Sequence, residues 1–139
     1  MNRKEFLSQV GAGAAALLVP ACFGSLSSCS PAAGNFPAAP TNVDFTLDVS
    51  TGPLAVKGGY TVTNGLIVAR TTADTFLAVS AACTHQGTTV EYIGASNYFY
   101  CPNHGANYNS AGMVTRGPAN QNLVQYKTTL TGTSLRVYS

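Results

Sequence analysis

Apolar and polar residues alternate in short runs along most of the chain, from about residue 43 to the end. Residues 43–49, VDFTLDV, show the alternation of a strand with one buried face. Residues 60–70, YTVTNGLIVAR, contain two such runs around Asn64-Gly65, a dipeptide typical of a tight hairpin turn. No long window keeps the period of an amphipathic helix. The pattern therefore predicts an all-β domain of short antiparallel strands, with a core built from one face of each strand.

Three later segments have the same character. They are rich in β-branched and aromatic residues and are separated by turn-forming residues, as expected of strands. Two of the predicted strands lead directly into a cysteine. The predicted elements are a strand at 75–82, a hairpin of strands at 88–93 and 97–101, a loop at 112–122, and a closing hairpin at 123–139 that turns near Thr131-Gly132.

The first 29 residues have a different pattern. Arg3 and Lys4 precede an uncharged stretch from residue 6 to residue 26, which is typical of an export signal. The stretch resembles a twin-arginine signal with a lysine in place of the second arginine, and residues 26–29, LSSC, resemble a bacterial lipobox. We therefore expect residues 1–29 to direct export, with lipid attached to Cys29. An uncleaved membrane anchor, plain secretion and a cytoplasmic protein are the alternatives.

The composition indicates how the chain is divided into a tether and a domain, and it argues against nucleic acid as a partner. Residues 30–42 are rich in proline and alanine and predict a tether, which leaves residues 43–139 as one domain. Charged residues make up 9% of the chain and the net charge is +2, so there is no basic patch suited to nucleic acid. The expected localisation is the bacterial envelope, at a membrane held through the lipid anchor.

The chemistry-bearing residues of the expected domain lie in two short loops. Cys83 and His85 follow one predicted strand, and Cys101 and His104 follow another. Fifteen residues separate His85 from Cys101, which is enough for an out-and-back hairpin that places the two loops side by side. Two thiolates and two imidazoles would then meet. The loops are closed by two glycines that we expect to serve backbone geometry, Gly87 and Gly105.

Three interpretations of these residues are possible. They could be unconnected loop residues, although the domain's whole supply of cysteine and histidine lies in the two matched loops. They could form a structural zinc site, but such sites usually pair their cysteines within one short motif. They could hold a two-iron cluster in which two histidines replace two cysteines on one iron. One cysteine and one histidine in each loop favour the cluster.

The spacing C-x-H, then fifteen residues, then C-x-x-H resembles the pattern of the Rieske 2Fe–2S family. Residues 65–87, GLIVARTTADTFLAVSAACTHQG, resemble the family's approach to its first cluster loop. Residues 98–119, YFYCPNHGANYNSAGMVTRGPA, resemble its second cluster loop and the covering loop that follows. The resemblance implies a Rieske-type fold of stacked small antiparallel sheets with a two-loop cluster-binding subdomain.

The resemblance also implies roles for single residues. Cys83 and Cys101 would bind one iron, and His85 and His104 would bind the other through Nδ1. Pro118 would cover the cluster. Histidine ligation raises the reduction potential of the cluster. With two thiolates and two neutral imidazoles the oxidised site has no net charge, whereas four thiolates would leave it negative, and a neutral site accepts an electron more readily.

Two differences from the high-potential members of the family indicate the range in which the reduction potential should lie. Rieske proteins of cytochrome bc complexes carry a cysteine pair that joins the two loops, and Thr88 and Asn103 stand at those positions here. The same proteins bind the cluster sulfurs with a serine and a tyrosine, and this chain has Ala106 and Tyr108. We therefore expect no disulfide, and a potential below the high-potential members and above the lowest.

The expected function is one-electron transfer between redox proteins. A donor or acceptor would be a cytochrome, a quinol-oxidising complex or a larger oxidoreductase subunit. A Rieske oxygenase also needs a mononuclear iron with its own histidines, and both histidines are already used, so the chain is not a complete oxygenase or an enzyme by itself. The alternatives are a small iron–sulfur subunit of an exported oxidoreductase and a non-redox lipoprotein with a Rieske-like fold.

Overall fold

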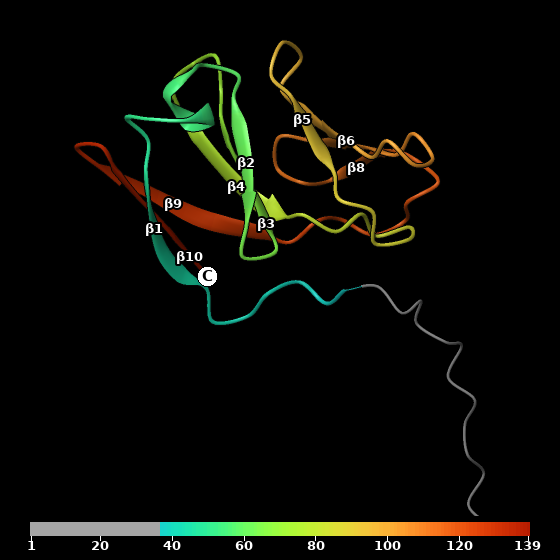
Figure 1. Cartoon of the computed structure of the whole chain (residues 1–139). Coiled ribbons are helices and arrows are strands. Elements are labelled where there is room, and N and C mark those ends of the chain that lie inside the picture. The colour runs from blue at the N-terminus through green and yellow to red at the C-terminus, as the bar shows by residue number, and fades with distance from the viewer. Residues whose placement is uncertain (1–36) are drawn as a thin grey trace, which may run out of the picture.

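The computed structural model describes residues 37–139, which fold into two antiparallel sheets. Figure 1 shows the sheets side by side, with β5, β6 and β8 next to the larger sheet. A single short 3₁₀ helix, η1 (Pro53–Ala55), accompanies the strands in the described part of the chain. The all-β fold class is therefore confirmed.

The larger sheet has six strands in the order β1-β10-β9-β4-β3-β2. Strand β3, between β4 and the edge strand β2, is buried on both faces: Leu66 and Val68 join one hydrophobic core, and Ile67 and Ala69 join the other. A strand covered on both faces has a continuous apolar sequence, which explains the run LIVA. The strands are β1 (Asp44–Asp48), β2 (Tyr60–Thr63), β3 (Leu66–Arg70), β4 (Phe76–Ser80), β9 (Gln125–Thr131) and β10 (Ser134–Tyr138).

The smaller sheet has four strands in the order β5-β6-β7-β8. Its inner face carries Tyr92, Phe99 and Tyr108, which pack against residues of β3 and β4 in one shared core. Cysteines 83 and 101 belong to the same core, so the packing between the sheets also fixes the two cysteine loops. The strands are β5 (Glu91–Ile93), β6 (Tyr98–Tyr100), β7 (Asn107–Asn109) and β8 (Val114–Arg116).

The structure differs from the sequence-based expectation in the smaller sheet. The hairpin of β5 and β6 was expected, but β7 and β8 were not, and residues 114–116 lie in the segment expected to be a loop. Both strands are three residues long and mostly polar, so hydrophobic periodicity gives no signal for them. They are formed because Tyr108 is buried against the neighbouring strand at Phe99.

The expected export signal, the lipidation site Cys29 and residues 30–36 of the expected tether lie outside the described residues. The remaining tether residues, 37–42, pass below the turn between β2 and β3 before β1 begins. The two ends of the domain meet, since the Ser139 N–H donates to the Val43 carbonyl at 3.1 Å. Among residues 37–139, no helix is long and apolar enough to cross a membrane.

Candidate metal centre

The first cysteine loop follows β4 and is closed by backbone hydrogen bonds. The Cys83 N–H donates to the Thr88 carbonyl at 2.8 Å, and the Gly87 N–H donates back to the Cys83 carbonyl at 2.7 Å. Gly87 has a φ of 74°, a left-handed conformation that glycine adopts without a steric penalty. The loop therefore turns back on itself within five residues and leaves the Cys83 side chain inside.

The second cysteine loop follows β6 and repeats this arrangement. The Cys101 N–H donates to the Ala106 carbonyl at 2.8 Å, and the Gly105 N–H donates to the Cys101 carbonyl at 3.0 Å. Gly105 has a φ of 76°. Both glycines thus have a left-handed backbone conformation, and the two loops are close copies of each other.

The four predicted ligands come together as two pairs. The Nδ1 atoms of His85 and His104 lie 3.1 Å apart, and their rings meet edge to face with centroids 4.6 Å apart. The thiols of Cys83 and Cys101 are close enough to influence each other's ionisation, and both residues are free and buried. Within residues 37–139, no group of three or more His, Cys, Asp or Glu residues is arranged to hold a metal ion together. Two pairs of donors, one of sulfur and one of nitrogen, match a site with two metal ions.

The loop backbones also direct N–H groups at the sulfur atoms. Burial opposes ionisation of the Cys83 thiol, but hydrogen bonds from the Tyr108 hydroxyl and from the N–H groups of His85 and Gln86 lower its pKa. Burial and the neighbouring Cys83 sulfur raise the pKa of Cys101. The pocket therefore stabilises negative charge on the Cys83 sulfur.

Tyr108 brings a hydroxyl group into this buried site. Its oxygen lies 3.2 Å from the Cys83 Sγ and 3.1 Å from the Thr84 Oγ1, and it accepts a hydrogen bond from the Thr84 N–H at 3.2 Å. Burial, followed by the bond to Cys83, raises the pKa of Tyr108 to about 12. The Thr84 hydroxyl donates its own proton to the Gln121 carbonyl at 2.6 Å, so the tyrosine proton is free to point at sulfur or at the threonine oxygen.

Two further contacts join the loops to their surroundings. The bond from Thr84 to Gln121 ties the first loop to the segment that follows β8, in which Pro118 is exposed. The Asn103 amide donates to the Gln86 side-chain oxygen at 3.4 Å and joins the two cysteine loops. The sequence carries no signal for Gln121, because this residue takes part through its backbone carbonyl and any residue type offers that group.

The outer rim of the site is open on the imidazole side. His104 is exposed and His85 is half-buried, whereas the two cysteines are at most 1% exposed. The sulfur pair thus lies in the core between the sheets, and the imidazole pair lies at the surface.

Comparison with known proteins agrees with this geometry. The model of the Rieske [2Fe-2S] domain matches residues 40–127. The chain belongs to the Rieske [2Fe-2S] domain family. A relative is the cytochrome b6-f complex iron-sulfur subunit of Chlorobaculum thiosulfatiphilum, 45% identical over 58 residues, which are 42% of this chain and 32% of that protein. The chloroplastic b6-f subunit of Pisum sativum is 41% identical over 69 residues, 45% of this chain and 30% of that protein.

Solved Rieske structures are similar as well. The cyanobacterial plasma membrane Rieske protein PetC3 from Synechocystis PCC 6803 is 31% identical, with a TM-score of 0.50 over 58% of this chain and 85% of that chain. The ferredoxin of carbazole 1,9a-dioxygenase from Nocardioides aromaticivorans, at 22% identity, shares the fold with a TM-score of 0.52 over 60% of this chain and 86% of that chain. The Rieske chain described here spans about a third of the length of the b6-f subunits that it matches.

The family identifies the cofactor as a Rieske-type 2Fe–2S cluster, and the residues present fit it. A cluster of this type needs two thiolates on one iron and two imidazole nitrogens on the other. The paired sulfurs and the paired Nδ1 atoms would provide that donor set, and the backbone N–H groups around Cys83 and Cys101 would provide the hydrogen bonds that sulfur ligands accept.

Proposed function

We propose that this Rieske protein transfers single electrons between redox proteins. The observation that carries the proposal is the pairing of two buried thiols with two imidazoles whose Nδ1 atoms are 3.1 Å apart at the surface. When bound, the cluster supplies a centre that accepts and releases one electron. Cys83 and Cys101 would hold the inner iron, and His85 and His104 would hold the outer one.

Each residue near the ligands then has a distinct task. Gly87 and Gly105 allow the turns that direct backbone N–H groups at sulfur. Tyr108 donates a hydrogen bond toward Cys83. Pro118 and its loop, tied to the first cysteine loop through Thr84, would cover the site. The exposed His104 offers the shortest route from the site to a partner.

The potential is proposed to lie between those of the highest and lowest members of the family. Ala106 is fully buried beside Cys101 and has no hydroxyl group, so one donor to the site is missing, while Tyr108 provides another. Thr88 and Asn103 leave the loops without a disulfide at those positions, and the hydrogen bond between Asn103 and Gln86 is one of the contacts that join the loops, beside that of His85 with His104.

We propose the location of the protein in the cell from the sequence of residues 1–36 alone. An export signal and a lipid on Cys29 would hold the domain at a membrane of the bacterial envelope, and the chain preceding the domain would serve as its tether. The partners would be a cytochrome, a quinol-oxidising complex or a larger oxidoreductase. The similarity to PetC3, a plasma membrane Rieske protein, supports a membrane location.

A second candidate is a permanent iron–sulfur subunit of a larger complex. It is favoured by the b6-f relatives, which are named as subunits. A stable large partner that copurifies with the full chain would favour it over a free electron carrier.

A coulometric titration of the purified protein tests the proposed function. Transfer of one electron per two iron atoms, reversible and at a potential between the extremes of the family, is the expected result. Uptake of no electrons by well-folded, iron-replete protein would contradict the proposal and would leave the non-redox lipoprotein as the better account.

A further inference from the structure

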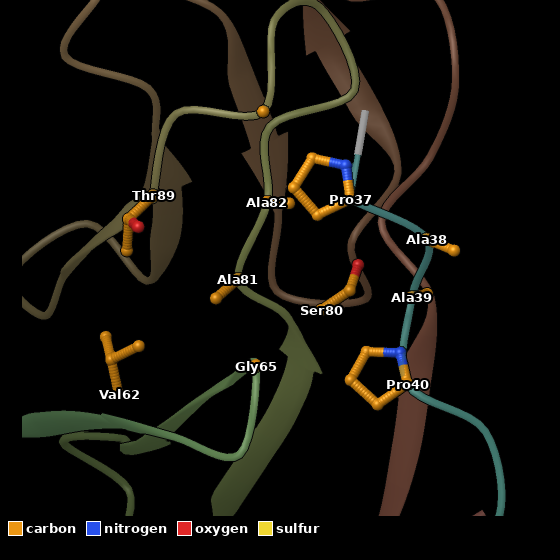
Figure 2. A pocket seen from close by; sticks show the side chains of 11 residues that line it. Pro37, Ala38, Ala39, Pro40, Val62, Gly65, Ser80, Ala81, Ala82 and Thr89 are labelled. Carbon is orange, nitrogen blue, oxygen red and sulfur yellow. The ribbon is translucent and has the colours of Figure 1, made fainter. Parts of the chain in front are cut away.

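Residues 37–40, Pro-Ala-Ala-Pro, lie across the surface between two glycine turns. Figure 2 shows Pro37 beside the chain above Ala82, and Pro40 beside the turn at Gly65. A Cβ atom on Gly65 would lie 2.9 Å from the Pro40 Cγ, and a Cβ atom on Gly87 would lie 2.8 Å from the Pro37 Cδ. Each proline ring therefore packs where a side chain larger than glycine would collide with it.

A buried hydroxyl group holds this segment in place. The Tyr126 hydroxyl, from β9, donates to the Pro40 carbonyl at 2.7 Å. Tyr126 is 5% exposed and belongs to the core of the larger sheet, so it is a fixed donor. A backbone carbonyl bound by a buried side chain 86 positions away is a specific contact between the segment and the body of the domain.

The contact with Gly87 distinguishes the two cysteine loops. Gly87 and Gly105 occupy equivalent positions and have nearly the same φ, 74° and 76°. A Cβ on Gly105 would meet no atom within 4 Å, whereas Gly87 is covered by Pro37. The first loop alone is therefore supported from outside by the N-terminal segment.

The contacts described above lie at the two ends of the segment, at Pro37 and at Pro40. A pocket of about 220 Å³ lies beneath it, lined by residues such as Val62, Ala81 and Thr89. Proline fixes φ at both ends and restricts the preceding residue to extended conformations, so the segment is stiff. A stiff segment held at two points transmits a displacement from one end to the other.

We propose that residues 37–40 form a strap that positions the first cysteine loop, with Pro37 in contact with the loop and Tyr126 acting as a positioning residue through Pro40. Because residues 1–36 join the domain through the strap, a pull on the N-terminal chain reaches residues 83–88 before any other part of the site. The strap couples the position of that chain to the order of the loop that carries Cys83 and His85. It rests on the proposed function only in taking these residues as ligands.

Hydrogen–deuterium exchange of the full chain tests the strap through a matched pair of variants. Tyr126→Phe removes the donor to Pro40, and Tyr92→Phe is the control, because the Tyr92 hydroxyl also donates at 2.7 Å but to Asn97. We expect Tyr126→Phe to speed exchange of the protected amides in residues 83–88 about fivefold, the equivalent of one lost hydrogen bond. Residues 101–105 should exchange as in the wild type, and Tyr92→Phe should leave residues 83–88 unchanged.

Pro37→Ala gives a second, independent perturbation and decides the matter if Tyr126→Phe does not fold. It removes the ring carbon over Gly87, and Pro53→Ala, at the start of η1, is its control. Faster exchange confined to residues 83–88 supports the strap. Unchanged exchange there, or an equal increase in both loops, overturns it.

Electron paramagnetic resonance provides the readout that general destabilisation would not change. If the strap orders the ligands, Tyr126→Phe broadens the lines of the reduced protein and Tyr92→Phe does not. Equal line widths in the wild type and Tyr126→Phe would contradict the positioning role. The complete absence of a Rieske signal in the wild type would count against the proposed function, while the exchange comparison would still decide whether the strap exists.

Discussion

Replacing Tyr108 by phenylalanine should lower the reduction potential of the Rieske protein. The change removes one hydroxyl group and keeps the ring, which is fully buried between the sheets. That hydroxyl lies 3.2 Å from the Cys83 Sγ and lowers the pKa of this thiol, so it acts as a donor when the sulfur is a thiolate. An added electron makes the site more negative, so a donor at sulfur stabilises the reduced form more than the oxidised form.

The size of the effect follows from the strength of such a bond. A hydrogen bond to a charged group contributes about 1.5–3 kcal/mol, and since the sulfur is anionic in both redox states we assign about 1 kcal/mol to the difference between them. For a one-electron couple about 59 mV corresponds to 1.4 kcal/mol, so the expected decrease is about 40 mV.

A redox titration at neutral pH, followed by paramagnetic resonance, measures this decrease. Tyr92→Phe is the control, because it removes another buried hydroxyl from the same sheet that bonds Asn97 and not Cys83. Thr84→Val sharpens the comparison by removing the competing acceptor 3.1 Å from the Tyr108 hydroxyl, so its potential should not fall. An unchanged potential in Tyr108→Phe, or an equal fall in Tyr92→Phe, would refute the reasoning.

The remaining predictions concern ligation, cross-linking and stability. His104→Cys adds a negative charge to the site, so titration should show a potential lower by on the order of 100 mV or loss of the cluster, and an unchanged potential and spectrum would exclude His104 as a ligand. Treatment with a thiol reductant should leave the spectrum and the thermal midpoint unchanged, since Thr88 and Asn103 cannot form a disulfide; a lowered midpoint would contradict this. The bond to Arg136 holds the pKa of Asp44 below its ordinary value of 3.8, so wild type should be more stable than Asp44→Asn above pH 3.8 and should lose that advantage as the pH falls through the lowered value. Urea unfolding across this range checks it, and a difference that does not depend on pH would count against the ion pair.

The sequence predicts most of the larger sheet and the principal features of the site. Asn64-Gly65 marks the first hairpin, because strand alternation and turn residues are signals that lie within a short stretch of sequence. The cysteine and histidine spacings likewise indicate two matched loops. β7 and β8 cannot be predicted in this way, since most of their residues are polar. Their pairing depends on Tyr108, which is buried and lies opposite Phe99 of β6.

Long-range contacts through backbone groups are equally hidden from the sequence. The bond from Thr84 to Gln121 joins residues 37 positions apart, and the bond from Tyr126 to Pro40 joins residues 86 positions apart. In both cases the acceptor is a carbonyl group that every residue type has, so no residue pattern indicates the contact. The Pro/Ala-rich composition of residues 30–42 predicts a tether but not the packing of its last part against Gly65 and Gly87.

The most direct test of the central claim is the electron paramagnetic resonance spectrum of the dithionite-reduced full chain, measured together with its iron and sulfide content. The paired thiols and paired imidazoles predict two irons and two sulfides per chain and a Rieske-type signal, distinct from that of a cluster with four cysteine ligands. Well-folded, iron-replete protein that lacks this signal, or protein that holds one zinc ion in its place, would contradict the account.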